Sequence, residues 1–376
     1  MSETPKAKNA QPRFRLQEAG LVIVILIMGT LLTWLGGSVE LPKLQVNEFG
    51  ETERVFIEDE DGNRTLVTEK RNKFLNAESL INLAKDTSFI AIMAVGATYV
   101  IVAGQIDLSV GAIYALASVI GALVLHLFGP DGAKAATAPW IGISLGMLTC
   151  IAVATFCGFL NGAMVVALRV HPFVITLGTM AIYRGIANVI TQGQSITEFP
   201  EGFQAMIRGD GSSELSVVPL IVMVMVTVVA GVWLGRLAAG RRVYAVGGNE
   251  EASRYSGISV GRVKIGVFVI AGLTAGISSV LALGYYGAAG SADGSGYELK
   301  VIAAAVIGGT SLTGGRGTAL GALLGAVIIQ IIDYGIIILG INPDYNQIII
   351  GASLIIAVVF DQISTQFANR RALEAS

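Results

Sequence analysis

The chain has 376 residues, of which 53% are hydrophobic and only 14% are charged, and its formal net charge is −2. A soluble domain typically carries about 25% charged residues, so this composition favours a protein whose surface lies in a lipid bilayer. The near-neutral charge gives no indication of a nucleic-acid partner. Glycine is abundant, with 47 residues, which suits transmembrane helices that pack closely through small side chains.

Ten apolar stretches approach the length that a transmembrane helix requires, which is roughly 20 residues. The sequence therefore predicts an all-α, polytopic membrane protein with about ten transmembrane helices, at residues 20–37, 87–103, 107–128, 139–167, 172–191, 217–235, 263–286, 299–313, 318–340 and 346–362. The eighth stretch is short and ends in glycines, so a complete crossing and a re-entrant segment both stay open. The first is interpreted as a retained span, because it is about 18 residues long and lacks an A-x-A cleavage site.

Lysine and arginine residues predict which helix ends face the cytoplasm. They gather in the N-terminal tail, in the loop after the sixth span and at the C-terminus, at Lys6, Lys8, Arg13, Arg15, Arg236, Arg241, Arg242, Arg254, Arg262, Lys264, Arg370 and Arg371. With ten spans these segments share one side, which the positive-inside rule assigns to the cytoplasm. Both termini are therefore predicted to be cytoplasmic, with tails at 1–19 and 363–376 and a transmembrane domain at 20–362.

The stretch at residues 38–74 is polar and lies on the predicted outer side. It holds six Lys/Arg and nine acidic residues, and longer loops follow the positive-inside rule weakly. We predict a small extracytoplasmic insertion with a hairpin around Asp61-Gly62.

The sequence contains none of the motifs that mark common catalytic or nucleotide-binding sites. It has no G-x-x-x-x-G-K phosphate loop, no G-x-S-x-G and no H-E-x-x-H. His126 and His171 stand alone. Cys150 and Cys157 would lie about 10 Å apart on a helix, too far for a disulfide, and are interpreted as packing residues. We expect no enzymatic activity, no bound metal and no cofactor in this chain.

Asp107, in the motif GQIDLSVG, is a candidate functional residue because a carboxylate beside the lipid core is costly. One interpretation is structural, in which Asp107 caps the next helix by accepting from backbone N–H groups near Ser109 and Val110. The other interpretation gives Asp107 and Ser109 a role in the solute pathway or in gating.

Two further polar sites lie in apolar surroundings. Arg184 falls well inside the fifth span and needs a partner, for which a backbone carbonyl and Asp333 are the candidates. The segment GGTSLTGGRG at 308–317 is either a turn at the membrane interface or a flexible part of the pathway. Ser311 and Thr313 are therefore candidate pathway or gating residues.

A compact polar helix is predicted at GNEEASRYSG, residues 248–257, between two strongly apolar stretches. Asn249 is a good N-cap, two glutamates follow where acidic residues suit the helix dipole, and Gly257 provides a stop. Glu251 and Arg254 are three residues apart and are predicted to pair. A helix of about two turns is not stable alone, so it either packs on its own bundle or docks on a soluble partner.

The passage RRVYAVGGNEEASRYSGISVGRVK resembles the cytoplasmic coupling loop of ABC importer permeases. The pattern of that loop is E-A-A-x-x-x-G, and this chain has Glu251-Ala252-Ser253 followed by Gly257, with serine in place of the second alanine. GQIDLSVGA, HPFVITLGTMAIYRGIA, AVGGNEEAS, AAAVIGGTSLTGGRGT and an Ile-Asn-Pro near the last span resemble, in that order, the branch that imports ribose, xylose, galactose and related sugars. The resemblance covers residues 75–362. Gln105 departs from the more usual glycine, and the insertion at 38–74 is longer than expected.

The resemblance implies the transmembrane permease subunit of an ATP-binding-cassette importer. Such a protein moves a pentose, hexose or polyol across the bacterial cytoplasmic (inner) membrane by alternating access. The implied partners are a second permease subunit, expected to be identical, a cytoplasmic ABC ATPase that binds ATP and Mg, a periplasmic solute-binding protein, and membrane lipid. The ATPase-coupling loop would lie at 236–264 and dock through Asn249, Glu250, Glu251, Ala252, Ser253, Arg254 and Gly257.

The residues alone leave a second class of protein open, which is an ion-coupled secondary transporter of a small polar solute. In that case Asp107, Arg184 and Asp333 would carry the coupling charges. Uptake that depends on an ion gradient and not on ATP would distinguish this class from an ABC permease.

Overall fold

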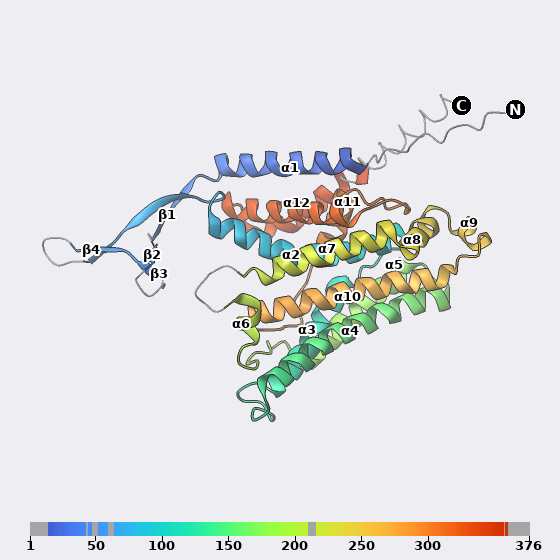
Figure 1. Ribbon diagram of the computed structural model, residues 1–376, viewed down its shortest axis with the longest axis horizontal. Helices are drawn as coiled ribbons and strands as arrows, with labels where there is room; N and C mark the ends of the chain where they lie inside the picture. The colour runs from blue at the N-terminus through green and yellow to red at the C-terminus, as the bar shows by residue number, and fades with distance from the viewer. Residues whose placement is uncertain are drawn as a thin grey trace.

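The computed structural model of the protein describes residues 14–42, 44–46, 52–58, 64–209, 216–356 and 358–359. Its helices are α1 (Phe14–Leu35), α2 (Ala77–Val102), α3 (Val110–Leu127), α4 (Pro139–Leu168), α5 (Pro172–Thr191), α6 (Phe203–Arg208), α7 (Val218–Arg236), α8 (Ala238–Gly248), α9 (Glu250–Tyr255), α10 (Val260–Tyr286), α11 (Tyr297–Ile307), α12 (Ala319–Ile338) and the 3-10 helix η1 (Pro343–Tyr345). The long helices run broadly alongside one another, and the short helices α8 and α9 lie at one end of the bundle (Figure 1).

Eight of the described helices are long and apolar enough to cross a membrane, namely α1, α2, α3, α4, α5, α7, α10 and α12. They correspond to predicted spans one to seven and nine, so the prediction of an all-α polytopic membrane protein is confirmed. The second span begins at Ala77 instead of residue 87. The side chain of Asn76 caps it by accepting from the N–H of Ser79 at 2.8 Å, and its first turns are too polar for a hydropathy pattern to include them.

The eighth and tenth predicted spans differ from the other eight. A complete crossing at 299–313 is excluded, because α11 has 11 residues. At about 1.5 Å per residue it covers about half of the ~30 Å hydrocarbon core. The chain then passes through 308–318 without a helix before α12 begins. The tenth stretch is helical at 346–356 and 358–359, and its end lies outside the described residues.

Helix α2 lies at the centre of the bundle, where α7, α10, α11 and α12 contact it. Every residue from Thr87 to Val102 is buried, and a helix that is apolar on all sides suits such a position. Lys85, just before this stretch, is also buried. Its ammonium group donates to the hydroxyl of Tyr285 at 3.0 Å and lies 4.1 Å from the centre of that ring, so the buried charge has a partner.

Helices α4 and α10 pack against each other through glycines. A Cβ atom on Gly158 would lie 2.3 Å from the carbonyl oxygen of Phe268, and one on Gly272 would lie 2.3 Å from that of Ala154. The two backbones approach so closely that a side chain fits at neither position. Close contact through small residues is typical of helix pairs in membranes.

Three short antiparallel strand pairs lie between α1 and α2. They are β1 (Ser38–Pro42) with β6 (Thr68–Asn72), β2 (Leu44–Val46) with β3 (Thr52–Arg54), and β4 (Phe56–Glu58) with β5 (Arg64–Leu66). The pairing of β4 with β5 agrees with the predicted hairpin, while Asp61 and Gly62 themselves lie outside the described residues. The strands are at the end of the bundle opposite α8 and α9 (Figure 1).

We predict that Gly272→Ala destabilises the protein, because the added methyl group meets the backbone of α4. Overpacking of this kind costs about 1–3 kcal/mol. Gly266→Ala is the matched control, since a Cβ atom at Gly266 on the same helix has no other atom within 4 Å. Thermal unfolding in detergent should give a lower midpoint for Gly272→Ala only, and equal midpoints for the two variants would contradict the close approach of α4 and α10.

Candidate functional site

The predicted coupling helix forms as α9, directly after α8. Asn249 separates the two helices, and its Oδ1 accepts a hydrogen bond from the N–H of Ala252 at 2.8 Å. Beyond α9, Gly257 has a φ of +80°, a left-handed conformation that glycine adopts without strain. The predicted N-cap and the predicted stop are both confirmed.

Glu250 ties α9 to the long helix α10. Its carboxylate pairs with Arg254 at 3.2 Å within α9 and with Lys264 at 2.8 Å on α10. The predicted pair between Glu251 and Arg254 is wrong, because Arg254 lies one turn from Glu250 and pairs there instead. Glu251 is exposed, which leaves its charge free to face a partner.

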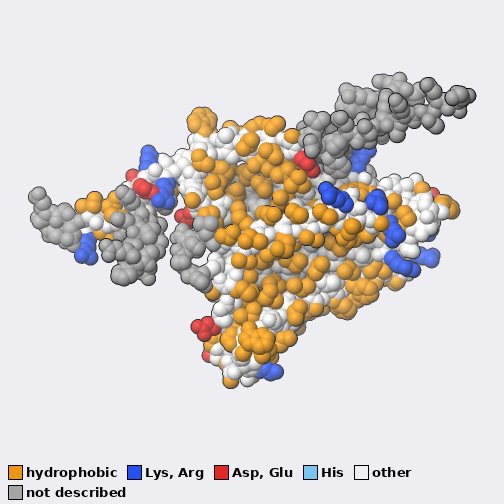
Figure 2. Space-filling view, in the orientation of Figure 1, with side chains coloured by type: hydrophobic (Ala, Val, Ile, Leu, Met, Phe, Trp, Pro, Cys, Tyr) orange, Lys and Arg blue, Asp and Glu red, His pale blue; other side chains and the backbone are white. Residues whose placement is uncertain are grey.

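Most of α9 faces solvent and not the bundle. Ser253 is its buried residue, whereas Glu251, Ala252, Arg254 and Tyr255 are exposed, and Tyr255 is 86% exposed. Exposed arginine side chains gather at this end of the molecule (Figure 2), including Arg236, Arg241, Arg242 and Arg262. The segment is therefore a capped and anchored helix that presents one face outward beside a positively charged surface.

Helix α8 packs directly on the backbone of two other segments. A Cβ atom on Gly247 would lie 1.7 Å from the carbonyl oxygen of Val102, at the end of α2. The same carbonyl accepts a hydrogen bond from the N–H of Gly315, between α11 and α12, at 2.8 Å. We call the contact of Val102, Gly247 and Gly315 the backbone junction. It connects α8 and α9, which together form the predicted coupling segment, to the two places where the chain leaves helical geometry, at 103–109 and 308–318.

Ser311 and Thr313 lie in the second of these breaks, beside the backbone junction. Ser311 is buried, its N–H donates to the carbonyl of Arg316 at 3.1 Å, and its hydroxyl lies 3.0 Å from that of Thr313. The hydroxyl of Tyr244, on α8, donates to the carbonyl of Gly317 at 2.7 Å. The break is therefore a hydrogen-bonded turn that is also bonded to the coupling segment.

A buried polar network joins the first break to α4 and α5. Oδ1 of Asp107 accepts from the N–H of Ser109 at 2.8 Å and from its hydroxyl at 2.6 Å, which confirms the predicted bond to Ser109. The amide of Asn161, on α4, donates to the Ser109 hydroxyl at 2.7 Å. It also accepts from the hydroxyl of Tyr183, on α5, at 3.2 Å. All four side chains are buried.

Asn161 and Tyr183 are not among the residues that the sequence singles out. Their partners come from other helices, so no local spacing connects them to Asp107. The available signal is an asparagine within a long apolar span, because side-chain amides in membranes tend to bond across helices. An asparagine in such a span predicts that its amide forms a hydrogen bond across helices, but it does not identify the residues that the amide bonds.

Arg184 lies apart from this network, where α5 meets the segment that follows α10. Its guanidinium donates to the backbone carbonyls of Ser291 and Asp293 at 2.7 and 2.5 Å. Asp333, the other candidate partner, pairs instead with Lys300 at 2.6 Å. The carbonyl alternative is thus confirmed. The structure brings the predicted pathway residues together in two pairs, Asp107 with Ser109 and Ser311 with Thr313. Arg184 contacts neither pair.

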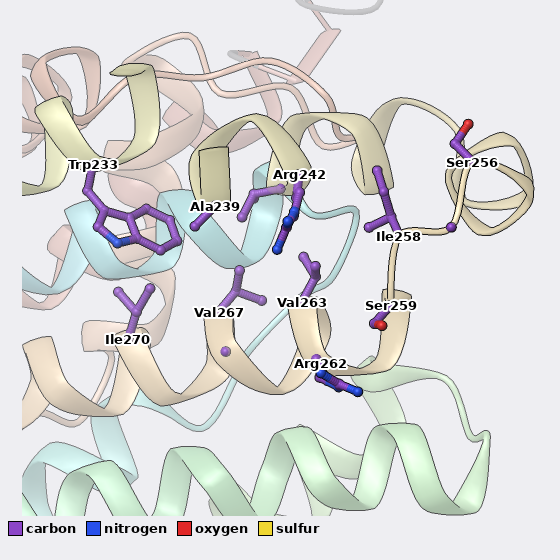
Figure 3. A pocket seen from close by; sticks show the side chains of 13 residues that line it. Trp233, Ala239, Arg242, Ser256, Ile258, Ser259, Arg262, Val263, Val267 and Ile270 are labelled. Atoms are coloured by element: carbon purple, nitrogen blue, oxygen red, sulfur yellow. The ribbon is translucent and has the colours of Figure 1, made fainter. Parts of the chain in front are cut away.

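A cavity of about 560 Å³ opens beside α9, between α7, α8 and α10 (Figure 3). Trp233 and Val267 contribute apolar walls, Arg242 contributes a charged one, and Gly257 and Ile258 line it from the turn after α9. The surface next to the coupling helix is therefore concave, with its polar side chains nearest to α9.

Comparisons with known proteins cover most of the chain. Residues 79–358 match the family described as branched-chain amino acid transport system / permease component. The chain is 37% identical over 289 residues to the ribose import permease protein of Bacillus subtilis, which covers 77% of this chain and 86% of that protein. It is 33% identical over 304 residues to the galactose/methyl galactoside import permease protein of Escherichia coli, covering 79% and 90% of the two chains. It is 34% identical over 291 residues to the D-allose transport system permease protein of Escherichia coli, covering 77% and 85%. No solved structure gave a significant match.

We predict that Asn161→Leu lowers the stability of the protein, because it removes the amide that joins the hydroxyls of Ser109 and Tyr183. The loss of one buried hydrogen bond costs about 0.5–1.5 kcal/mol, and the hydroxyls of Ser109 and Tyr183 keep their other partners, Oδ1 of Asp107 and the carbonyl of Cys157. The control is Ser144→Leu, at an exposed serine of α4, the helix that carries Asn161. The unfolding midpoint in detergent should fall for Asn161→Leu and stay near the wild-type value for Ser144→Leu. If both variants unfold at the wild-type midpoint, the network does not contribute to stability.

Proposed function

Because the chain belongs to the permease-component family of branched-chain amino acid transport systems, we propose that it is the transmembrane subunit of an ATP-binding-cassette importer for a monosaccharide or polyol. The solute crosses the bacterial cytoplasmic (inner) membrane by alternating access, and separate subunits hydrolyse ATP. The observation that carries the proposal is α9, an exposed polar helix that the ion pair of Glu250 with Lys264 anchors to α10 of the membrane domain.

The names of the relatives favour a sugar over an amino acid. The family description names branched-chain amino acids, whereas the three relatives are named for ribose, for galactose or methyl galactoside, and for D-allose. Each of these relatives is at least 33% identical over more than three quarters of this chain. We therefore assign the substrate class from the relatives and not from the family description.

The form of the coupling segment supports a soluble ATPase as partner. Asn249 and Gly257 fix the two ends of α9, and Glu250 fixes its position on α10. The exposed face carries Glu251 and Tyr255. A six-residue helix does not hold itself in water, so the membrane domain maintains it in a shape ready for docking. In this proposal ATP and Mg bind to the partner and not to this chain.

The backbone junction provides a route from the docking helix into the membrane. A movement of α8 displaces the end of α2 and the turn before α12, because Gly247 contacts both without intervening side chains. Ser311 and Thr313 lie in that turn and are proposed gating residues. Asp107 and Ser109 are proposed to pass the movement on to α4 and α5. Coupling through contiguous packed and hydrogen-bonded groups is a common physical basis for such transmission.

Two copies of this chain are proposed to form the pathway. Gly178, Ala181 and Gly185 are exposed on α5, and a Cβ atom at either glycine would meet no other atom within 4 Å. Exposed small residues permit a second helix to approach closely. A periplasmic binding protein would dock at the opposite end from α9, where the strand pairs of 38–72 lie, and lipid would surround the remaining apolar faces.

Uptake by the complete importer tests this function. We expect proteoliposomes that contain the permease, its ATPase and its binding protein to accumulate at least one of D-ribose, D-galactose, D-allose and xylitol, and only when ATP is present. L-leucine is included in the panel as a branched-chain amino acid, the class that the family description names. Accumulation of leucine alone would overturn the substrate class. Uptake driven by a proton or sodium gradient without ATP would establish the ion-coupled alternative in place of the importer.

Charge reversal on α9 tests the docking surface. Glu251→Lys and Tyr255→Ala should each weaken binding of the purified ATPase to the permease by about ten-fold, because a reversed charge opposes a complementary surface and an aromatic residue at the centre of an interface often costs more than ~1 kcal/mol when truncated. Both residues are exposed, so the fold should be retained. Glu201→Lys, the same reversal at an exposed residue between α5 and α6, is the control. Unchanged ATPase affinity in both α9 variants would remove α9 from the interface.

A further inference from the structure

A narrow cavity of about 190 Å³ lies at the far end of α10 from α9, between α3, α10 and the segment 287–296. Hydroxyl groups, aromatic rings and a carboxylate line it, contributed by Tyr114, Ser118, Ser195, Tyr286, Asp293 and Tyr297. The cavity is distinct from the coupling helix and from the network of Asp107. It is formed within one copy of the chain.

Two hydroxyl groups in this cavity, carried by the buried residues Tyr114 and Ser118, have no hydrogen-bond partner in the described part of the chain. Tyr114 is 4% exposed and Ser118 is 2% exposed, and both lie on one face of α3. Other buried hydroxyls, such as those of Ser88 and Thr98, bond back to a carbonyl of their own helix. Neither oxygen is among the fully enclosed polar atoms of the described chain that lack a partner, so both hydroxyls are open to the cavity. The hydroxyls of Tyr114 and Ser118 are therefore positioned to bond something in the cavity.

The aromatic wall of the cavity has an apolar face and a polar edge. The rings of Tyr114 and Tyr297 lie with their centroids 5.5 Å apart and their planes at 43°. A tyrosine offers a broad apolar surface together with a hydroxyl group that donates and accepts. A sugar has the same division, with C–H groups on the faces of its ring and hydroxyls around its edge. The wall therefore matches a polyhydroxylated ring better than a purely apolar or purely ionic ligand.

The opposite wall is held in place by bonds within the chain. Arg184 donates to the carbonyls of Ser291 and Asp293, and the N–H of Gly290 donates to Oδ2 of Asp293 at 2.8 Å. These bonds fix the segment 287–296 against α5 without a ligand. Oδ1 of Asp293 is left to accept a hydrogen bond from a ligand, and a wall fixed in advance lowers the entropic cost of binding.

The size of the cavity selects a small solute, and a lining that holds a carboxylate and no basic side chain disfavours an anion. The volume corresponds to about six water molecules at ~30 Å³ each, and it is below the ~300 Å³ at which sites for drug-sized ligands begin. One monosaccharide or polyol fits this volume, and a disaccharide does not. A metal ion is disfavoured, because Asp293 provides the carboxylate among the lining residues and no group of three His, Cys, Asp or Glu in the described chain could hold a metal.

We propose that this cavity is a subsite in which the permease itself binds one neutral, hydroxyl-rich solute of monosaccharide size. Its role in transport rests on the proposed function, since a solute delivered at this end of the bundle would be held here before it moves inward. Tyr114 and Ser118 are then specificity-determining residues of the permease, in addition to whatever selection a binding protein makes.

Direct binding to the full-length permease in lipid nanodiscs, without ATPase or binding protein, tests the subsite. Saturation-transfer NMR with D-ribose, D-galactose, D-allose, xylitol and L-leucine should detect at least one sugar or polyol and not leucine. Tyr114→Phe and Ser118→Ala should each weaken that binding by about two- to ten-fold, the usual effect of removing one hydrogen bond. Ser88→Ala, which removes a buried hydroxyl bonded within its own helix, should leave the affinity unchanged.

A cavity-filling variant gives a second measurement. Ala282→Leu adds three carbon atoms to the lining and should abolish binding, while its unfolding midpoint shows whether the fold is retained. If no panel compound binds the wild-type permease, or if Tyr114→Phe, Ser118→Ala and a folded Ala282→Leu all bind normally, the subsite is wrong. ATP-driven sugar uptake by the complete importer would still leave the proposed function standing. Conversely, binding that these variants abolish would support the subsite even if ATP-driven uptake is absent.

Discussion

The carbonyl group of Val102 is the contact on which the coupling segment and the membrane domain both depend. It accepts a hydrogen bond from Gly315 and leaves no space for a side chain at Gly247. Three segments that are far apart in the sequence therefore meet through backbone atoms alone. Flexible side chains usually absorb small displacements between packed elements, and here none intervenes. Consequently, α8 does not move without also displacing the breaks at 103–109 and 308–318.

Features that depend on a few neighbouring residues could be predicted from the sequence. The cap at Asn249, the stop at Gly257 and the need of Arg184 for a partner follow from local chemistry, and the structure has all three. The sequence left a backbone carbonyl and Asp333 both open as that partner. The pairing of Glu250 could not be predicted in the same way, because one of its two partners, Lys264, lies on another helix. The network around Asn161 likewise joins three separate segments. Hydropathy located most spans, and at α11 it left a complete crossing and a re-entrant segment both open. The apolar residues of α11 end in a turn with its own hydrogen bonds and not in a longer helix.

The two ends of the bundle differ in chemistry, and the difference fits separate tasks. At the end of α9, charged and exposed groups surround a concave surface, as expected where a water-soluble protein binds. At the other end of α10, tyrosine and serine side chains enclose a small volume that suits a hydroxyl-rich molecule. The buried network of Asp107, Ser109, Asn161 and Tyr183 joins the break at 103–109 to α4 and α5. In the two proposals made above, energy enters at one end of the protein and recognition of the solute takes place at the other.

The complete burial of α2 bears on how the protein is made. Of the candidate spans α2 has the lowest mean hydropathy, 1.4, and 94% of its apolar window is covered by protein in the finished fold. Two of the helices that cover it, α10 and α12, are synthesised much later. During biogenesis α2, the least hydrophobic of these spans, must therefore stay in the membrane or beside the insertion machinery without its final neighbours. It obtains them only when α10 and α12 have been synthesised. A ribosome that stalls before α10 would release a fragment whose central helix has lost its intended surroundings, and membrane quality-control proteases can recognise such a helix.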